Sequence, residues 1–259
     1  MKGKTALITG SSSGLGLAMA QGLAGAGCNL VLHGLESPQN MTPTCQALAQ
    51  AHGVAACYVS ADLTESGAIE ALINTAQTQM GGIDVLINNA VVRHFSPLED
   101  FPGERWDQAL AVNLTAAFRA IQLCLPGMRA QGWGRIFNMS SAYGSRAIAN
   151  RIDYVTTKTA LLGLTRAVAV ETQGQGITCN AVCPGSVLTD NIESRLTALM
   201  AHQQLDRDTA TREFLRGKQG TGRFIDAAHV ADLVVFLCSA SGTHITGATL
   251  PVDDGWLAS

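Results

Sequence analysis

The sequence has 259 residues, of which 47% are hydrophobic and 14% are charged, and it contains 27 glycines. This composition excludes a disordered chain and a coiled coil, and the length allows a large buried core. The net charge of −3 gives no basic surface for nucleic acid or for an anionic membrane, so neither is expected as a partner.

Short apolar runs alternate with longer segments of helical periodicity along the chain. Seven runs are predicted to be strands: 5–9, 29–33, 55–62, 84–90, 135–141, 177–184 and 248–254. Helices are predicted over 14–26, 65–80, 104–131 and 154–172. Strands that are apolar on both faces and joined by helices predict one α/β domain over residues 1–259. We expect a Rossmann fold, with a doubly wound, mostly parallel seven-stranded sheet and helices on both faces.

One stretch, 187–222, is polar and only partly helical. It lies between Pro184-Gly185 and Gly220-Thr221-Gly222. We interpret it as a flap over the carboxyl edge of the sheet, where substrates bind in such folds.

Seven cysteines form no CxxC pair and lie mostly in apolar runs, which favours buried free thiols over disulfides or metal ligands. The histidines have no metal-ligand spacing, so no metal site is predicted. The N-terminal apolar run is too short for a signal peptide, and polar residues interrupt the other apolar stretches before they reach the length of a bilayer span. A cytoplasmic location is therefore expected.

The first predicted strand is followed directly by TGSSSGLG, residues 9–16. Gly10, Gly14 and Gly16 would let the backbone turn tightly and approach a pyrophosphate, which would face free N–H groups at the start of the next helix. The alternative is a glycine-rich turn without a ligand, but the position between a strand and a helix favours a dinucleotide.

The end of the second strand, LVLHGLE, supplies no Lys or Arg for a 2′-phosphate, which favours NAD over NADP. Glu36 lies slightly late in this stretch and is either a ribose contact or a solvated loop acid. Asp62 ends the third strand, where it could accept from the adenine amino group or cap the segment that begins near Thr64.

Tyr154 and Lys158 lie four residues apart and would share one face of a helix. An ammonium beside a phenol favours the phenolate, so the tyrosine would become a better proton carrier near neutral pH. Ser141, thirteen residues before Tyr154, ends a predicted strand and could hold the substrate oxygen. A Tyr-x-x-x-Lys pair alone often occurs by chance, but the coupled spacings favour a catalytic site.

The chain resembles the short-chain dehydrogenase/reductase family over nearly its whole length. The resemblance rests on TGSSSGLG, NNA (88–90), VNLTAAF, Ser141, YVTTK (154–158) and PGSVLT (184–189), which follow the order and approximate spacing of the family's motifs. It implies a catalytic tetrad of Asn113, Ser141, Tyr154 and Lys158. Tyr154 would be the acid/base and Ser141 would orient the reacting oxygen. Lys158 would hold the ribose and lower the phenol pKa, and Asn113 would support a water relay.

The same resemblance implies a set of positions that bind the nicotinamide cofactor, for which we expect NAD. They are Gly10, Ser12, Gly14, Leu15, Gly16, Asp62, Leu63, Asn89, Ala90, Tyr154, Lys158, Pro184, Gly185, Val187 and Thr189. The family also implies a homotetramer.

Two positions depart from the family's pattern. Val91 replaces the glycine usual after NNA, and Asp254 replaces the first glycine of the usual DGG. A protein that binds a nucleotide as a sensor and has lost catalysis would explain both, but the intact tetrad argues against that alternative.

Four stretches resemble a bacterial subgroup that acts on D-3-hydroxybutyrate: QAHGV, EDFPGERWD, ETQGQGIT and DGW. Its substrate-contacting positions correspond here to Arg93, Tyr143, Arg151, Ser186, Arg195 and Trp256, in addition to Ser141 and Tyr154. At the first five of these six the subgroup has glutamine, histidine, lysine, tryptophan and glutamine, so the match is incomplete.

The resemblance predicts an NAD-dependent oxidoreductase that interconverts a 3-hydroxycarboxylate and its 3-oxo acid. Three arginines exceed what one small monoanion requires, so a longer or more anionic acid is also considered. Each arginine could instead be a surface residue, and Trp256 could be a packed core indole. The alternative enzymes are a reductase of 3-oxoacyl thioesters and a sugar or polyol dehydrogenase; a reductase of this kind is expected to use NADPH.

Overall fold

The computed structural model covers residues 1–259 and contains one sheet of seven strands, all paired in parallel. The strands are β1 (Thr5–Ile8), β2 (Asn29–Gly34), β3 (Ala56–Ser60), β4 (Val85–Asn88), β5 (Gly134–Met139), β6 (Ile177–Pro184) and β7 (Thr249–Val252). Their order is β3-β2-β1-β4-β5-β6-β7. The predicted doubly wound fold is confirmed, and each predicted strand overlaps an observed one.

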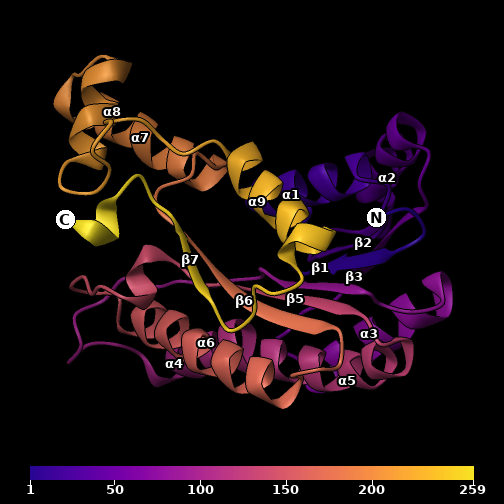
Figure 1. Ribbon diagram of the computed structural model, residues 1–259. Coiled ribbons are helices and arrows are strands. Elements are labelled where there is room, and N and C mark those ends of the chain that lie inside the picture. The colour runs from indigo at the N-terminus through magenta and orange to yellow at the C-terminus, as the bar shows by residue number, and fades with distance from the viewer.

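Helices cover both faces of the sheet (Figure 1). One layer contains α1 (Gly14–Gly25), α2 (Pro38–His52) and α9 (Ala227–Cys238). The other contains α3 (Ala68–Met80), α4 (Gly103–Leu110), α5 (Ala116–Gln131) and α6 (Ile152–Glu171). The helices predicted from periodicity did not include α2 or α9. The start of α2 had a local signal, because Ser37 caps it and proline occupies its first position.

The core is divided by the sheet into two apolar clusters. Ala6 and Ile8 of β1 face the layer of α1 and α9, whereas Leu7 faces the opposite layer. This alternation is the ordinary consequence of strand geometry, in which successive side chains point to opposite faces. A strand buried on both faces must be apolar throughout, which explains why the strands read as continuous hydrophobic runs.

The segment Gly103–Gln131 forms one continuous helix, in which a single π-helical turn, η1 (Ala111–Thr115), separates α4 from α5. By length and apolar composition alone this helix could cross a membrane, contrary to our expectation that no stretch was long enough. In the structure, Ala120, Ile121 and Cys124 on its inner side are buried in the core against the sheet.

The chain order places a crevice at the carboxyl edge of the sheet. The connection after β1 leads to β2 on one side, whereas β4 lies on the other side of β1, so the loops after β1 and β4 diverge. The segment 187–222 contains α7 (Asp190–Gln203) and α8 (Arg207–Leu215). Figure 1 shows these two helices apart from the layers that cover the sheet and close to the C-terminus.

Candidate active site

A cavity of about 560 Å³ opens at this edge. It is lined by the loops after β1, β2, β3, β4, β5 and β6, by the start of α6 and by α7. All the predicted cofactor and substrate positions line it. Of the predicted tetrad, Ser141, Tyr154 and Lys158 do so too, whereas Asn113 lies behind the wall, beside a second, much smaller cavity.

The glycine loop approaches its neighbours too closely to carry side chains at two positions. A Cβ on Gly10, whose φ is 63°, would lie 2.9 Å from the Cα of Ala90, and one on Gly16 would lie 2.2 Å from the carbonyl oxygen of Gly10. No side chain caps the start of α1, and its first turn contains no acidic residue. Its free N–H groups can therefore face the pyrophosphate of a dinucleotide.

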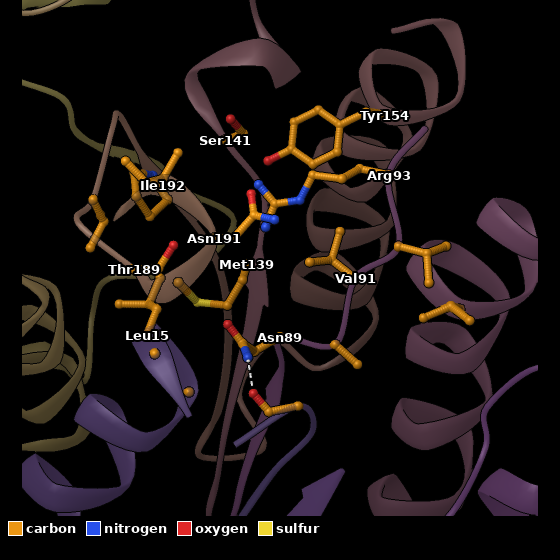
Figure 2. Close-up of a pocket in the computed structure, with 18 of the residues that line it drawn as sticks. Leu15, Asn89, Val91, Arg93, Met139, Ser141, Tyr154, Thr189, Asn191 and Ile192 are labelled. Atoms are coloured by element: carbon orange, nitrogen blue, oxygen red, sulfur yellow. Dashed lines mark hydrogen bonds between the residues drawn. The ribbon is translucent and has the colours of Figure 1, made fainter. Parts of the chain in front are cut away.

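The loop is tied to β4 through Thr9 and Asn89. The Thr9 hydroxyl accepts from the backbone N–H groups of Asn89 (2.9 Å) and Ala90 (3.0 Å). The Asn89 amide donates to the carbonyl oxygens of Thr9 (3.0 Å) and Gly10 (2.7 Å), and Figure 2 shows this side chain at the base of the cavity. Asn89 thus fixes the glycine loop as well as lining the cofactor side of the cavity.

His33, at the end of β2, is a buried residue that the motif analysis overlooked. Its Nδ1 accepts from the backbone N–H of Gly10 (3.1 Å), and its Nε2 donates to the carbonyl oxygen of Ala61 (3.0 Å). These partners require the neutral tautomer with its proton on Nε2. Burial lowers the pKa of His33 below its ordinary value, in agreement with that tautomer.

Glu36 lies in the same end of the cavity, beside Ser12 and Gly34. Its carboxylate accepts from the Tyr58 hydroxyl (3.2 Å). Partial burial pulls the pKa of Glu36 upward, but hydrogen bonds from its own backbone, Ser12 and Tyr58 hold it below its ordinary value. Of the two roles left open for Glu36, the geometry favours a contact in the cofactor site.

Asp62 also lines the cavity, but its carboxylate accepts from the backbone N–H (2.9 Å) and the hydroxyl (2.8 Å) of Thr64. These bonds close the turn after β3. The expected helix cap is wrong, because α3 begins only at Ala68, with Gly67 at its N-cap and no side-chain cap. Hydrogen bonds from the backbone and side chain of Thr64 lower the pKa of Asp62, which keeps it ionised.

Tyr154 and Ser141 both project into the cavity (Figure 2). Tyr154 lies in the first turn of α6, and the Ser141 hydroxyl, just after β5, accepts from the Tyr143 N–H at 3.2 Å. Lys158, one turn further along α6, lies with its Nζ 5.7 Å from the centre of the Tyr154 ring. The Lys158 Nζ donates to the carbonyl oxygen of Met139 (2.5 Å). Burial, aided by the charge of Arg93, lowers the pKa of Lys158 to about 7.

Asn113 occupies the π-helical turn and is buried. Its side chain accepts from the Val92 N–H (2.8 Å) and donates to the Val92 carbonyl (2.9 Å) and to the Thr157 hydroxyl (3.1 Å). Asn113 therefore connects the loop after β4 to α6, one residue before Lys158. Such π turns are frequent at functional sites because they shift a side chain out of helical register.

The opposite end of the cavity is cationic and aromatic. Arg151 lies with its guanidinium carbon 4.1 Å from the centre of the Phe95 ring and 4.6 Å from that of Tyr154. Arg195 lies 5.5 Å from the centre of the Phe95 ring and 5.1 Å from that of Phe214. All five residues line the cavity, so the structure brings together arginines predicted from distant parts of the chain.

Trp256 satisfies both of its alternative interpretations. It is buried and packs edge-on against Tyr143 with ring centres 5.0 Å apart, and it also lines the cavity. The Tyr143 ring is in turn edge-on to that of Tyr154, at 6.4 Å. Trp256 thus supports the cavity wall beside Tyr154 through the ring of Tyr143.

The two departures from the family's pattern have different structural outcomes. Val91 has no positive φ and projects into the cavity, so its side chain is accommodated without left-handed backbone strain (Figure 2). Asp254 has a φ of 57°, a region that aspartate enters more easily than most residues. Its carboxylate accepts from the Thr221 N–H (2.7 Å), which joins the C-terminal segment to the end of the segment 187–222.

Several cavity residues escaped the sequence analysis, notably His33, Phe95, Phe214 and Lys218. No spacing marks them, because each comes from a strand end, a loop or a helix that only the fold brings to the edge of the sheet. Three of them had indirect signals: Phe95 follows Arg93 by two residues, and Phe214 and Lys218 lie within the segment interpreted as a flap. The structure contains no group of three or more side chains that could hold a metal ion.

Comparison with known proteins agrees with this geometry. The family model described as "Enoyl-(Acyl carrier protein) reductase" matches residues 10–257. D-beta-hydroxybutyrate dehydrogenase of Cupriavidus necator is 39% identical over 100% of this chain and 99% of that protein. The enzyme of the same name from Rhizobium meliloti is 37% identical over 98% of this chain and 99% of that protein.

A solved structure shares the fold. The crystal structure of L-sorbose reductase from Gluconobacter frateurii, complexed with NADPH and L-sorbose, superposes with a TM-score of 0.95 at 29% identity. The match covers 100% of this chain and 98% of that one. Relatives with similar folds therefore include enzymes named for a hydroxy acid and for a sugar.

Proposed function

Because this chain belongs to the short-chain dehydrogenase/reductase family and is an oxidoreductase, we propose that it interconverts a 3-hydroxycarboxylate and its 3-oxo acid, with NAD as the hydride carrier. One observation carries the proposal. Tyr154 and Ser141 project into a cavity whose far end is an uncapped helix with a glycine loop, while its near end contains arginines. The family relationship supports a nicotinamide cofactor, and the choice of NAD and of the acid is our inference.

The chain's own residues would handle the proton and the carboxylate. In the oxidation, Tyr154 takes the hydroxyl proton of the substrate and Ser141 holds the same oxygen by a hydrogen bond. Three cations surround the Tyr154 ring, at 4.6 Å (Arg151), 5.7 Å (Lys158) and 5.9 Å (Arg93) from its centre. These positive charges would stabilise negative charge that develops on oxygen at this end of the cavity. Asn113 positions the chain between Tyr154 and Lys158 through its bond to Thr157.

Glu36 supports NAD rather than NADP. Its ionised carboxylate lies beside Ser12 and Gly34, where the adenosine ribose of a dinucleotide bound at the glycine loop would lie. A carboxylate can accept from a ribose hydroxyl and repels a 2′-phosphate. Because Lys and Arg are absent from 30–36, no cation there offsets that repulsion.

The arginines support an acid rather than a neutral sugar. Arg93, Arg151 and Arg195 line the substrate end, and none forms an ion pair within the chain. A substrate carboxylate would provide the bidentate partner that a guanidinium favours, which the hydroxyls of a sugar do not. We also infer that the chain acts as one catalytic domain, with the segment 187–222 as its substrate flap, and that it forms a homotetramer.

The test is hydride transfer by the Tyr154→Phe variant. We expect NADH formation from NAD and 3-hydroxy acids by the native protein and a loss of roughly 10²- to 10⁴-fold in kcat for the variant, which lacks only the proton-carrying oxygen. NAD binding, measured by calorimetry, should be nearly unchanged. Tyr143→Phe is the matched control and should retain far more activity. Normal turnover by Tyr154→Phe would refute the assignment.

A further inference from the structure

Four cations gather at the substrate end of the cavity without any acidic partner. We call Arg93, Arg151, Arg195 and Lys218 the cation cluster; all four line the cavity. None takes part in the five ion pairs of the chain. Only Lys218 has a hydrogen bond to the protein, from its Nζ to the carbonyl oxygen of Phe214 (2.7 Å). The three guanidinium groups therefore have unused donors directed at one space.

Arg151 shows that this arrangement is more than a set of solvated surface residues. Its side chain is stacked between the rings of Phe95 and Tyr154, and only 6% of the residue is exposed. Its buried Nε has no hydrogen-bond partner in the protein. The Nε of Arg135 in the core is likewise buried without a partner, so this atom alone does not indicate a ligand. The terminal nitrogens of Arg151 line the cavity and also lack an acceptor in the protein, which a bound anion would supply.

The cluster is also electrostatically unfavourable when empty. Burial lowers the pKa of Arg151. The neighbouring charges of Arg93 and Arg195 lower it further, whereas Tyr154 and Asp153 act in the opposite direction. Burial likewise lowers the pKa of Arg195, with a contribution from Arg93, and the pKa of Lys218, with a contribution from Arg195. Repulsion between neighbouring positive charges therefore extends across the cation cluster. One bound carboxylate would neutralise one charge and leave the remaining repulsion largely in place.

Nearby acids offset this repulsion only in part, because the charge of Asp153 raises the pKa of Arg151 but Asp153 forms no ion pair with it. Asp153 is the acid closest along the chain to Arg151, but one of its carboxylate oxygens binds the backbone and ring of His94 and the other accepts from the Tyr154 N–H. Among acids that line the cavity, Glu36 and Asp62 lie at the cofactor end, and Asp190 is the first residue of α7.

We propose that the substrate carries two anionic groups: it is a 3-hydroxy dicarboxylate, and the cation cluster binds its second carboxylate. This inference rests on the proposed function, because it concerns the specificity of the same site. Arg151 and Arg93, which both lie beside Tyr154, hold one carboxylate. Arg195 holds the second one, and the exposed Phe95 ring contacts the methylene groups between them.

A dicarboxylate fits better than an acyl thioester of a nucleotide-bearing carrier. The cavity of about 560 Å³ must also hold the dinucleotide, which leaves room for a small substrate only. Arg151 lies deep in the cavity against the ring of Tyr154, so the anionic group that it binds must lie close to the reacting carbon. The phosphates of a carrier thioester lie many bonds from that carbon.

The experiment compares substrates of equal length that differ only in the second charge. The purified full-length protein is assayed with NAD and four acids: 3-hydroxyglutarate against 3-hydroxyvalerate, and 3-hydroxyadipate against 3-hydroxyhexanoate. We expect kcat/KM for at least one diacid to exceed that of its matched monoacid by about tenfold to a hundredfold, the range that charge-assisted hydrogen bonds provide. The preference should weaken at high salt.

A variant then locates the second carboxylate. Arg195→Gln should raise KM for the preferred diacid and reduce the ratio of diacid to monoacid kcat/KM about tenfold. Arg216→Gln removes an exposed arginine of the same segment that does not line the cavity, and it should leave the ratio unchanged. An Arg195→Gln ratio equal to that of the native protein would contradict the assigned role.

The outcomes separate this inference from the proposed function. Oxidation of monoacids and diacids with equal kcat/KM, or of monoacids only, would overturn the inference and leave the proposed function in place. Preference for a 3-hydroxyacyl thioester over every free acid would overturn the inference in favour of carrier recognition. The absence of turnover with any 3-hydroxy acid would overturn the proposed function, and the inference with it.

Discussion

The side chain of Asn113 pairs with both backbone groups of Val92. It accepts from the N–H at 2.8 Å and donates to the carbonyl oxygen at 2.9 Å, as a neighbouring strand would. This pairing joins the π-helical turn to the loop after β4, and a third bond to Thr157 joins both to α6. These bonds therefore fix the position of the loop that carries Val91 and Arg93 into the cavity.

We expect Asn113→Ala to destabilise the protein and to impair catalysis. The substitution leaves the part-buried backbone groups of Val92 unpaired, which costs about 1–3 kcal/mol in the free energy of unfolding. Turnover should fall as well, because the loop and α6 lose their connection. Chemical denaturation and steady-state kinetics provide the measurements, with the exposed Asn74→Ala as control. An Asn113→Ala protein with the native free energy of unfolding would show that these bonds do not stabilise the fold.

Glu36→Ser is expected to change cofactor preference. Without the carboxylate, NADP is no longer repelled and NAD loses a hydrogen-bond acceptor, so kcat/KM for NAD should fall about tenfold. The corresponding value for NADP should rise. The measurement is the ratio of kcat/KM for NAD to kcat/KM for NADP. The control is Glu65→Gln, because Glu65 is exposed and its side chain forms no ion pair. If the ratio remains at the native value, Glu36 does not contact the ribose.

His33 should make cofactor binding sensitive to acid. Because burial lowers the pKa of His33 in the folded protein, its stabilising contribution is present above the ordinary histidine pKa of about 6.5 and is lost as the pH falls through the lowered value. Protonation would place a hydrogen on Nδ1, which would then face the Gly10 N–H donor. NAD affinity, measured by calorimetry at pH 7.5 and at the lowest pH at which the protein stays folded, should therefore decrease at the lower pH.

Two variants isolate the role of His33. His33→Leu has no acceptor for Gly10 and should bind NAD weakly at both pH values. His33→Asn places an amide oxygen near the position of Nδ1, so it should bind NAD with little difference between the two. The same acid dependence in His33→Asn as in the native protein would assign the effect to another group.

Asp254→Gly should loosen the segment 187–222 while relieving the backbone. Glycine adopts the φ of 57° freely, but it cannot accept the Thr221 N–H. We expect several-fold faster hydrogen exchange at residues 219–223 and a higher KM for the substrate, with little change in NAD binding. Asp254→Asn retains an acceptor and should lie between the two. Unchanged exchange in Asp254→Gly would show that this contact does not hold the segment.

Local sequence was sufficient to predict much of the fold. The strands and the doubly wound arrangement followed from apolar runs and helical periodicity, because both depend on which residues lie next to one another along the chain. Gly10 and Gly16 were identifiable for the same reason, since a tight turn between a strand and a helix needs glycine wherever it occurs. Ser141, Tyr154 and Lys158 lie within eighteen residues, and their spacing alone predicts a shared edge and helix face.

Tertiary structure decided the features that depend on contacts between distant segments. The π-helical turn places Asn113 against Val92, and no residue type in AVNLT predicts such a turn. His33 reads as an ordinary residue at the end of a strand until Gly10 and Ala61 are brought to its two nitrogens. Whether Asp62 caps a helix or closes the turn at Thr64 also depended on side-chain geometry, which its position in the sequence could not specify.

The arginines show the division most clearly. Composition and motif positions by themselves identified three guanidinium groups, but each could equally have been a solvated surface residue. Only the fold stacks Arg151 between Phe95 and Tyr154 and brings Lys218 beside Arg195, because these residues come from three separate connections around one edge of the sheet. Burial and mutual repulsion depend on that arrangement in space, and they are the reason that we assign these cations to a binding site.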